Sequence, residues 1–413
     1  MSKVHELLLA EQMRQAECIE LIASENFVSE DILHAVGSVF TNKYTEGYPS
    51  KRTSGNKGRY YGGCWIYDEL EEYCCDKWRE VFNTDYHVNV QPHSGSNANL
   101  AAYMSVLKPG DTILAMRLDQ GGHLTHCSPV NFSGQFFKGV FYGLDESGRI
   151  DYDDLENKLR KYHPKLVLAG ASAYSRIIDY ERIWEIIDKV SHFELMTADQ
   201  FSPWSDTGRL RPWFMVDMAH VAGLIATGVH PSPFGYADII TTTTHKTLRG
   251  PRGGMIFCRP ELAKKVDSAV FPGCQGGPLQ HVIAGKAICA EEALTDDYTS
   301  YIHQVVKNAK AMAEEFIKMG YDVVTGGTDN HMFLLDFSKT HPNITGKLVQ
   351  EACDNSGITL NKNCVPNEKR SPMQTSGVRI GTPAMTTKGY KEEDFIRVAH
   401  DIDEIIKEIN KNG

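Results

Sequence analysis

Between about Asn89 and Ile256, hydrophobic positions form short aliphatic and β-branched runs that alternate with helical stretches. This alternation is typical of βα units stacked on a mostly parallel sheet. The clearest predicted strands are Thr112–Leu118, Lys165–Ala169, Trp213–Val216 and Asp238–Thr242. We therefore expect an α/β fold with helices on both faces of a central sheet.

Beyond Gln280 the pattern becomes one of longer helices. It predicts helices at His281–Leu294 and Tyr301–Met319, a strand at Met332–Asp336 and a polar helix at Glu392–Ile409. We expect a large domain over residues 41–280 and a smaller α+β domain over 281–413. Residues 1–40 are too short for a domain and are expected to form an arm that docks on another surface, such as a second copy of the chain.

Composition narrows the function classes. With 43 Lys and Arg against 53 Asp and Glu, the net charge of −10 offers no basic field for nucleic acid or an anionic membrane. No apolar run reaches the length of a membrane span, and Met1–Gln15 carries acids without a cleavable apolar core, so a cytoplasmic protein is expected. The ten cysteines include no CxxC and read as reduced. His123, His126 and Cys127 could be imagined as zinc ligands, but no second cluster matches them, and we expect no metal.

A lysine after a predicted strand carries the strongest chemical signal. Lys246 follows Thr241–His245 and precedes the glycine-rich segment Arg249–Gly254. The carboxyl ends of strands are where open α/β sheets bind ligands, and a lysine among hydroxyls and glycines suits Schiff-base chemistry. An isolated lysine of this kind is more often a surface residue in a loop.

Two further segments point to one cofactor. Asp217 ends the strand that runs into Met218–His220, where a buried acid could pair with the protonated ring nitrogen of pyridoxal phosphate. The segment Gln91–Asn99 leads into the helical Leu100–Leu107, and small or hydroxyl residues at a helix start favour a phosphate. The same residues also cap ordinary helices.

With these residues noted, the sequence closely resembles the serine hydroxymethyltransferase family of fold type I pyridoxal phosphate enzymes. The resemblance runs nearly end to end, through Leu21–Asn26, Thr41–Pro49, Tyr60–Gly63, Gln91–Ser96, Gly121–Gly134, Val216–Gly223, Thr241–Gly254, Phe271–Pro278, Gly326–His331, Asn361–Pro366 and Ser376–Pro383.

The resemblance implies a role for each residue that matches the family pattern. Lys246 would hold pyridoxal phosphate covalently, Asp217 would pair with the pyridine nitrogen and His123 would stack on the ring. The other cofactor-binding residues would be Ser94, Gly95, Ser96, Ser172, His220, Thr243 and His245, with Gly276 and Gly277 from a partner subunit.

For the substrates, the resemblance implies that Arg379 binds the amino-acid carboxylate, a role suited to a planar guanidinium. Ser24, Tyr44, Glu46 and Tyr61 would complete the serine site, with Tyr44, Glu46 and Tyr61 on the facing subunit. Glu46 would transfer protons, and Tyr44, Tyr61 and His220 would also serve catalysis. Glu46, Tyr60, Leu118, Gly122, Leu124 and Asn363 would line the folate site.

Plainer interpretations of several residues stay open. Tyr60 and Tyr61 could be interface packing, Leu118 and Leu124 could be ordinary core, and Asn363 could be a turn residue.

The chain departs from the family pattern at two insertions. Thr53–Arg59 adds seven residues before the paired tyrosines, with the composition of a flexible polar loop. A longer stretch, Ser191–Pro212, precedes the strand of Asp217, and its Trp204, Pro203 and Gly208 read as an ordered excursion rather than a helix. We expect Asp217 to remain the residue that matches the family's cofactor-binding aspartate. Asp199 could match it in another alignment, but it is not followed by the Ala-His pair found at Ala219-His220.

The reaction expected from this resemblance is the interconversion of serine and glycine, with tetrahydrofolate as one-carbon acceptor, by at least a homodimer and possibly a tetramer. The alternatives are a folate-independent aldolase acting on threonine or α-methylserine, and an inactive homologue that serves as a binding scaffold.

Overall fold

The structure, a computed structural model, describes residues 2–49, 58–197, 204 and 210–412. The chain divides into two compact units. The smaller unit comprises Met1–Phe27, Ala173–Arg176 and Tyr301–Gly413, and the larger comprises Val28–Ser172 and Ile177–Ser300. The opening residues are therefore grouped with the C-terminal part of the chain; the domain division at residues 40 and 280 stays a prediction.

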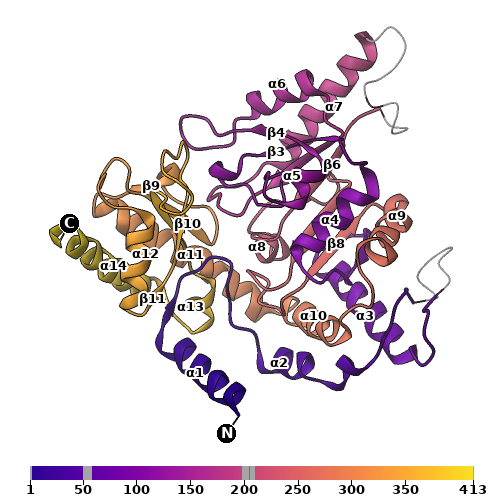
Figure 1. Ribbon diagram of the computed structural model, residues 1–413, viewed down its shortest axis with the longest axis horizontal. Helices are drawn as coiled ribbons and strands as arrows, with labels where there is room; N and C mark the ends of the chain where they lie inside the picture. Colours follow the sequence, from indigo (N-terminus) through magenta and orange to yellow (C-terminus); the bar gives the residue numbers. More distant parts are fainter. Residues whose placement is uncertain (1, 50–57, 198–203, 205–209, 413) are drawn as a thin grey trace. The chain divides into compact units, whose positions relative to one another are not determined.

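The larger unit is built on a central sheet whose strands follow the order β2-β8-β7-β6-β5-β3-β4 (Figure 1). The strands are β2 (His87–Asn89), β3 (Thr112–Met116), β4 (Lys138–Tyr142), β5 (Leu166–Gly170), β6 (Trp213–Asp217), β7 (Ile239–Thr243) and β8 (Gly254–Cys258). From β4 to β7 neighbouring strands are parallel, and β8 is antiparallel to β7 and β2. The predicted α/β fold with a mostly parallel sheet is confirmed, and four of these strands are those expected from the hydrophobic runs.

Helices cover both faces of this sheet (Figure 1). The α-helices that lie wholly in the larger unit are α2 (Glu30–Val36), α3 (Trp65–Val81), α4 (Gly95–Val106), α5 (Phe132–Phe136), α6 (Tyr152–Tyr162), α7 (Tyr180–Thr197), α8 (Ala222–Ala226), α9 (Ala263–Ser268) and α10 (Gln280–Ala293). The buried residues of α4 include three alanines, Ala98, Ala101 and Ala102, which pack in one cluster with Ile113 and Leu168 of the sheet. Because alanine allows close approach, α4 lies directly on the strands whose ends carry the candidate site.

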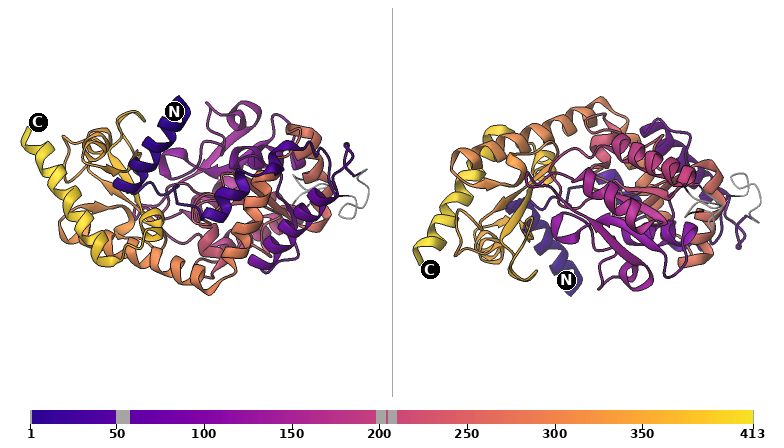
Figure 2. Two further views of the ribbon diagram at one scale, coloured as in Figure 1. Left: turned by 90° about the horizontal axis from the view of Figure 1, so that it is seen from below. Right: turned by 90° about the horizontal axis from the view of Figure 1, so that it is seen from above.

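The smaller unit contains an antiparallel sheet in the order β12-β13-β10-β9. Its strands are β9 (Asp322–Val323), β10 (Met332–Asp336), β12 (Asn361–Asn363) and β13 (Gly377–Gly381), and β1 (Ile19–Glu20) pairs separately with β11 (Ile358–Thr359). The helices are α1 (Lys3–Glu17), most of α11 (Asp296–Lys318), α12 (Gly346–Asn355), α13 (Pro383–Thr387) and α14 (Glu392–Asn412, yellow in Figure 2). Phe316, Phe333, Ile380 and Ile402 belong to a hydrophobic core cluster of this unit.

Helix α1 has no buried residue, and Val4, Leu7, Leu8 and Met13 are all more than half exposed. An apolar helix face that is left open in this way is typical of a surface awaiting a partner. None of the helices in the described part of the chain is both long and apolar enough to traverse a bilayer.

The prediction that the second insertion is not helical is wrong at its start, because α7 continues to Thr197. Charged contacts along the added turns stabilise the helix: Arg160 stacks on Phe193, and His163 lies 3.4 Å from Glu194. No glycine or proline interrupts the sequence before Pro203. Residues 198–203, which include Asp199, and 205–209 lie outside the described residues.

Two side chains, Trp204 and Arg211, hold the last part of the second insertion against the larger unit. Trp204 is fully buried and its indole N–H donates to the carbonyl of Pro164 at 2.8 Å. Arg211 donates two hydrogen bonds of 2.8 Å to the carboxylate of Asp238, the residue just before β7. A bidentate pair of this kind fixes the chain direction, and Asp217 follows at the end of β6.

Candidate functional site

Lys246 and Asp217 lie at the carboxyl edge of the central sheet. Asp217 ends β6 and is paired with Thr241 of β7, and Lys246 follows β7 after a short turn. The ammonium of Lys246 donates to the hydroxyl of Thr243 at 2.9 Å. Since β6 and β7 are parallel neighbours, both side chains belong to the edge where open α/β sheets bind ligands.

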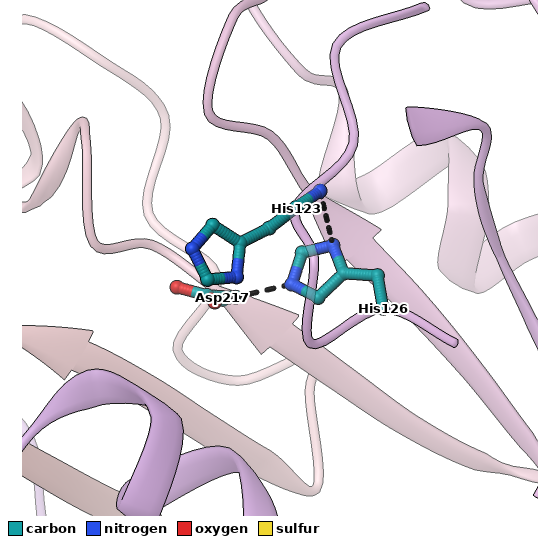
Figure 3. Close-up of side chains that lie close together, drawn as sticks. All are labelled: His123, His126 and Asp217. Carbon is teal, nitrogen blue, oxygen red and sulfur yellow. Dashed lines mark hydrogen bonds and ion pairs between the residues drawn. The ribbon is translucent and has the colours of Figure 1, made fainter. Parts of the chain in front are cut away.

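The carboxylate of Asp217 is held by three donors. Its Oδ2 accepts from Nε2 of His126 at 3.1 Å (Figure 3). The same oxygen accepts from Nδ2 of Asn99 at 2.9 Å, and Oδ1 accepts from the backbone N–H of Ala219 at 3.1 Å. Burial alone would raise its pKa, but His126, together with the hydrogen bond from Asn99, holds the pKa well below its usual range. Asp217 is therefore an ionised carboxylate with a fixed orientation.

The two histidines beside Asp217 have defined tautomers. The backbone N–H of His123 donates to Nδ1 of His126 at 3.3 Å, so the ring proton of His126 is on Nε2, facing Asp217. Asn99 also donates to the hydroxyl of Thr125 at 2.7 Å, and this hydroxyl lies 2.7 Å from Nδ1 of His123. The hydroxyl proton can therefore be donated to His123, which links both histidines to one network.

Ligand atoms of His123, His126 and Asp217 all lie within 4.8 Å of one another, which is close enough to hold a metal ion. In the observed arrangement, however, Nε2 of His126 carries a proton and donates it, so this nitrogen is not free to ligate. Burial raises the pKa of Cys127, the third residue considered from the sequence, to about 12, and its thiol stays protonated. The absence of a metal stays a prediction.

Glycines and hydroxyl side chains lie together at the start of α4. We call Ser94, Gly95, Ser96 and Gly254 the phosphate cup; Thr243 packs against Gly95. Ser94 caps this helix by accepting from the backbone N–H of Asn97. A Cβ on Gly95 would come within 2.7 Å of Thr243, and a Cβ on Gly254 within 2.3 Å of the Ser94 carbonyl. Only glycine permits this approach, and the N–H groups of Gly95 and Ser96 lie at the positive end of the helix.

His245 lies beside Lys246 and has an unsatisfied nitrogen. Among the described residues, its Nδ1 is buried without a hydrogen-bond partner. Burial, together with the charges of Lys246 and Arg252, lowers its pKa to about 3, so the imidazole is neutral. A buried polar atom of this kind usually indicates a ligand or water.

Ser172 and His220 belong to the same unit. The hydroxyl of Ser172 donates to the carbonyl of Gly122 at 2.8 Å, which joins the loop after β5 to the loop that carries His123. His220 is buried, and its carbonyl accepts from Thr247 at 2.9 Å. Both residues therefore have positions fixed by the loops around Asp217 and Lys246.

A second group of predicted residues gathers at one surface of the larger unit. The rings of Tyr44 and Tyr60 have centroids 5.2 Å and 5.3 Å from that of Tyr61. A Cβ on Gly276 would lie 3.2 Å from Glu46, and one on Gly277 would lie 3.1 Å from Tyr44. We call this set, Tyr44, Glu46, Tyr60, Tyr61, Gly276 and Gly277, the tyrosine patch; Tyr44 and Tyr60 are 60% and 81% exposed, which leaves these rings open to a partner.

The first insertion ends on a buried residue, which contradicts the expectation of a flexible polar loop through Arg59. Arg59 donates to Asp68 at 2.7 Å and to Glu71 at 2.8 Å. It also donates to the carbonyls of Thr45 and Gly47, which flank Glu46. Arg59 thus fixes the segment that carries Glu46, while residues 53–57 of the insertion lie outside the described residues.

The predicted folate residues fall in both units. Leu118 and Leu124 are 45% and 47% exposed, so they are not the ordinary core residues that the plainer interpretation would have. Asn363, in β12 of the smaller unit, donates to the neighbouring carbonyl of Cys364 at 2.7 Å.

Arg379 lies in β13 of the smaller unit, where it is 9% exposed. Its Nε donates to Oδ1 of Asn361 at 3.1 Å, and its guanidinium reaches the hydroxyl of Ser24 at 3.5 Å. Burial lowers its pKa to about 10, so it remains a cation that water shields poorly. Such a cation attracts a carboxylate more strongly than an exposed arginine does.

The sequence analysis did not predict Asn99 and Thr125 as site residues, although Asn99 lies in the segment noted for the phosphate.

The sequence of the whole chain can also be compared with known protein families. A sequence model described as serine hydroxymethyltransferase matches residues 2–202 and 205–402, which is nearly the whole chain. The family comprises transferases of fold type I that depend on pyridoxal phosphate. The chain therefore belongs to the serine hydroxymethyltransferase family.

Proposed function

We propose that this protein transfers the hydroxymethyl carbon of serine reversibly to tetrahydrofolate, which yields glycine and 5,10-methylenetetrahydrofolate. The observation that carries the proposal is the placement of Lys246, just after β7, at the same sheet edge as the ionised and oriented carboxylate of Asp217, which ends the parallel neighbour β6. A cytoplasmic location stays a prediction.

The residues at the sheet edge fit pyridoxal phosphate. Lys246 would hold it covalently beside Thr243, and the first turn of α4 would bind the phosphate through Ser94, Gly95 and Ser96. The unsatisfied Nδ1 of His245 and the close approach of Gly95 and Gly254 support this assignment. When bound, the cofactor supplies an electron sink for cleavage of a bond at the amino-acid Cα.

The chain's own residues define the ring-binding end of the site. Asp217 would keep the ring nitrogen protonated, because its lowered pKa leaves it ionised and a negative charge stabilises a cation next to it. His126 and Asn99 would prevent Asp217 from rotating away, and His123 would lie against the ring. Ser172 and His220 would lie near the ring's phenolic oxygen.

We further propose that the tyrosine patch completes the site of a second copy of the chain. Tyr44, Tyr61 and Glu46 would contact the substrate there, with Glu46 moving a proton at its carboxylate. Gly276 and Gly277 would meet the partner's phosphate, and Tyr60, Gly122, Leu118, Leu124 and Asn363 would contact folate. The exposure of Tyr44, Tyr60, Leu118 and Leu124 supports this proposal, as does the open apolar face of α1. A dimer is the smallest assembly it requires, and tetramers remain compatible with it.

The proposed function is tested with serine labelled with carbon-13 at the hydroxymethyl carbon. We expect a visible cofactor band that changes on addition of glycine and changes further with tetrahydrofolate, and label appearing in methylenetetrahydrofolate. Label released as free formaldehyde at the same rate without folate would instead identify an aldolase. A protein without a cofactor band would be the inactive scaffold.

Replacing Arg379 by alanine should raise the KM for serine. The substrate carboxylate would lose a bidentate charge-assisted partner, which is worth about 1.5–3 kcal/mol, or roughly 10- to 150-fold in KM. Arg379→Lys should restore only part of the affinity, because lysine keeps the charge but not the planar fork.

The control for this change is Arg397→Ala, since Arg397 lies in the same unit and is 68% exposed. Steady-state kinetics over a wide range of serine concentration distinguish the variants. An unchanged KM in Arg379→Ala would mean that another group binds the carboxylate.

A further inference from the structure

Lys286, in the middle of α10, is a buried ammonium surrounded by carbonyls. Its side chain is 1% exposed, and its Nζ donates to the carbonyls of Val90, Gly254 and Pro92 at 2.7, 2.8 and 3.1 Å. An ammonium has three protons, and each has an acceptor here. In the described part of the chain no carboxylate forms an ion pair with it, although a buried cation normally requires one. Burying an ammonium without a carboxylate partner costs free energy, which the fold must offset elsewhere.

The three carbonyls belong to two segments that meet under the proposed phosphate cup. Val90 and Pro92 lie in the segment that leads from β2 to Ser94, and Gly254 begins β8. The N–H of Gly254 donates to the carbonyl of Pro92 at 3.1 Å. A Cβ on Gly254 would lie 2.3 Å from the Ser94 carbonyl and 3.0 Å from the Gly95 nitrogen. Lys286 therefore fastens together the two strand ends on which the first turn of α4 rests.

Among the residues that the structure describes, none that we assign to the phosphate cup carries a full positive charge. Its members, Ser94, Gly95, Ser96 and Gly254, have no charged side chain. The nearby His245 is neutral, because burial, together with the charges of Lys246 and Arg252, lowers its pKa to about 3. The helix dipole supplies only about half a charge to a phosphate dianion.

Burial lowers the pKa of Lys286 to about 8, so its ammonium is still mostly protonated at neutral pH. Its Nζ lies 3.1 Å from the carbonyl of Pro92, two residues before Ser94, and 2.8 Å from that of Gly254, so the ammonium lies directly behind the cup. Burial lowers the pKa of His93, next to Ser94, the hydrogen bond with Gly277 raises it, and the charge of Lys286 lowers it.

We propose that Lys286 is a positioning residue for the cofactor phosphate, which holds the backbone of the cup in place and supplies a positive charge behind it. The inference rests on the proposed function, because it assumes that pyridoxal phosphate binds at Ser94–Ser96. The positive charge of Lys286 would balance part of the negative charge of the phosphate, which no residue of the cup can do.

The test compares two ligands that differ only in the phosphate. Cofactor-free wild type and Lys286→Met are titrated with pyridoxal phosphate and, separately, with pyridoxal. Methionine has nearly the same length as lysine but removes the charge and the donors. We expect the affinity for pyridoxal phosphate to fall roughly 10- to 100-fold in the variant, with pyridoxal binding changed less than about 3-fold. Inorganic phosphate should likewise compete less well in the variant.

Ile283→Ala is the matched control, because Ile283 is buried on the same helix and its loss removes packing without charge. It should weaken both ligands equally. If Lys286→Met does not fold, Lys286→Gln keeps donors for the carbonyls without the charge and should show the same selective loss. Equal loss for both ligands, or an unchanged preference for the phosphate, would overturn the inference. A wild type that binds no pyridoxal phosphate would instead overturn the proposed function, and this inference with it.

Discussion

Replacing Lys246 by alanine is expected to abolish both the covalent attachment of pyridoxal phosphate and hydroxymethyl transfer. Lys246 carries the amine at the sheet edge beside Thr243 and the strand of Asp217. Removal of a nucleophile that acts together with its neighbours lowers the rate by at least about a thousand-fold. After borohydride treatment, peptide mass mapping should find the cofactor mass on the wild-type peptide that contains Lys246, and nowhere on the dialysed variant.

Lys264→Ala provides the control, because Lys264 is an exposed lysine of the same unit. It should keep the visible band and the labelled peptide. A borohydride-stable label at one defined site in Lys246→Ala would show that another amine holds the cofactor.

Subunits that carry Glu46→Gln and subunits that carry Lys246→Ala should each be inactive alone and regain activity when mixed. If Glu46 completes the neighbour's site, one pocket of each heterodimer has both wild-type residues. Random exchange makes half of the dimers mixed, with one active pocket each, so about a quarter of the wild-type rate should return. The measurement is the rate of folate-dependent serine cleavage before and after subunit exchange.

Subunit exchange must be followed independently, for example with a mass tag on one variant. A mixture of two preparations that both carry Lys246→Ala should stay inactive and controls for contamination. If tagged heterodimers form without regaining activity, the pocket is built within one chain and the placement of Glu46 is wrong.

The central sheet was largely predictable because several of its strands are short runs of aliphatic or β-branched residues. All residues of β5 and β7 are buried, and they stand out between polar helices in the sequence. Lys246 and Asp217 could be predicted for a related reason. Each is a charged residue at the end of such a run or shortly after it. A charge at the end of a buried strand is a local signal that needs no knowledge of distant parts of the chain.

The Asn99 network could not be predicted because its partners are distant in sequence. Thr241, which donates to Asn99 at 2.6 Å, is 142 positions away, and Asp217 is 118 positions away. A neutral amide in a helix has no charge or periodicity that marks it as buried. Arg59 was misjudged for the opposite reason, since the polar residues before it resemble a loop while its acidic partners, Asp68 and Glu71, lie in α3.

The arginine at or near the end of each insertion has a consequence for how the chain tolerates changes in length. Arg59 is held by two acids of α3, and Arg211 is held by Asp238. Each arginine re-establishes the chain path at a fixed point, so the number of residues before it can change without displacing Glu46 or Asp217. Because the entropic cost of closing a loop grows only slowly with its length, the chain should tolerate insertions and deletions before each of these arginines. A protein engineer could introduce a peptide tag or a small domain just upstream of either arginine and still retain the geometry of the site.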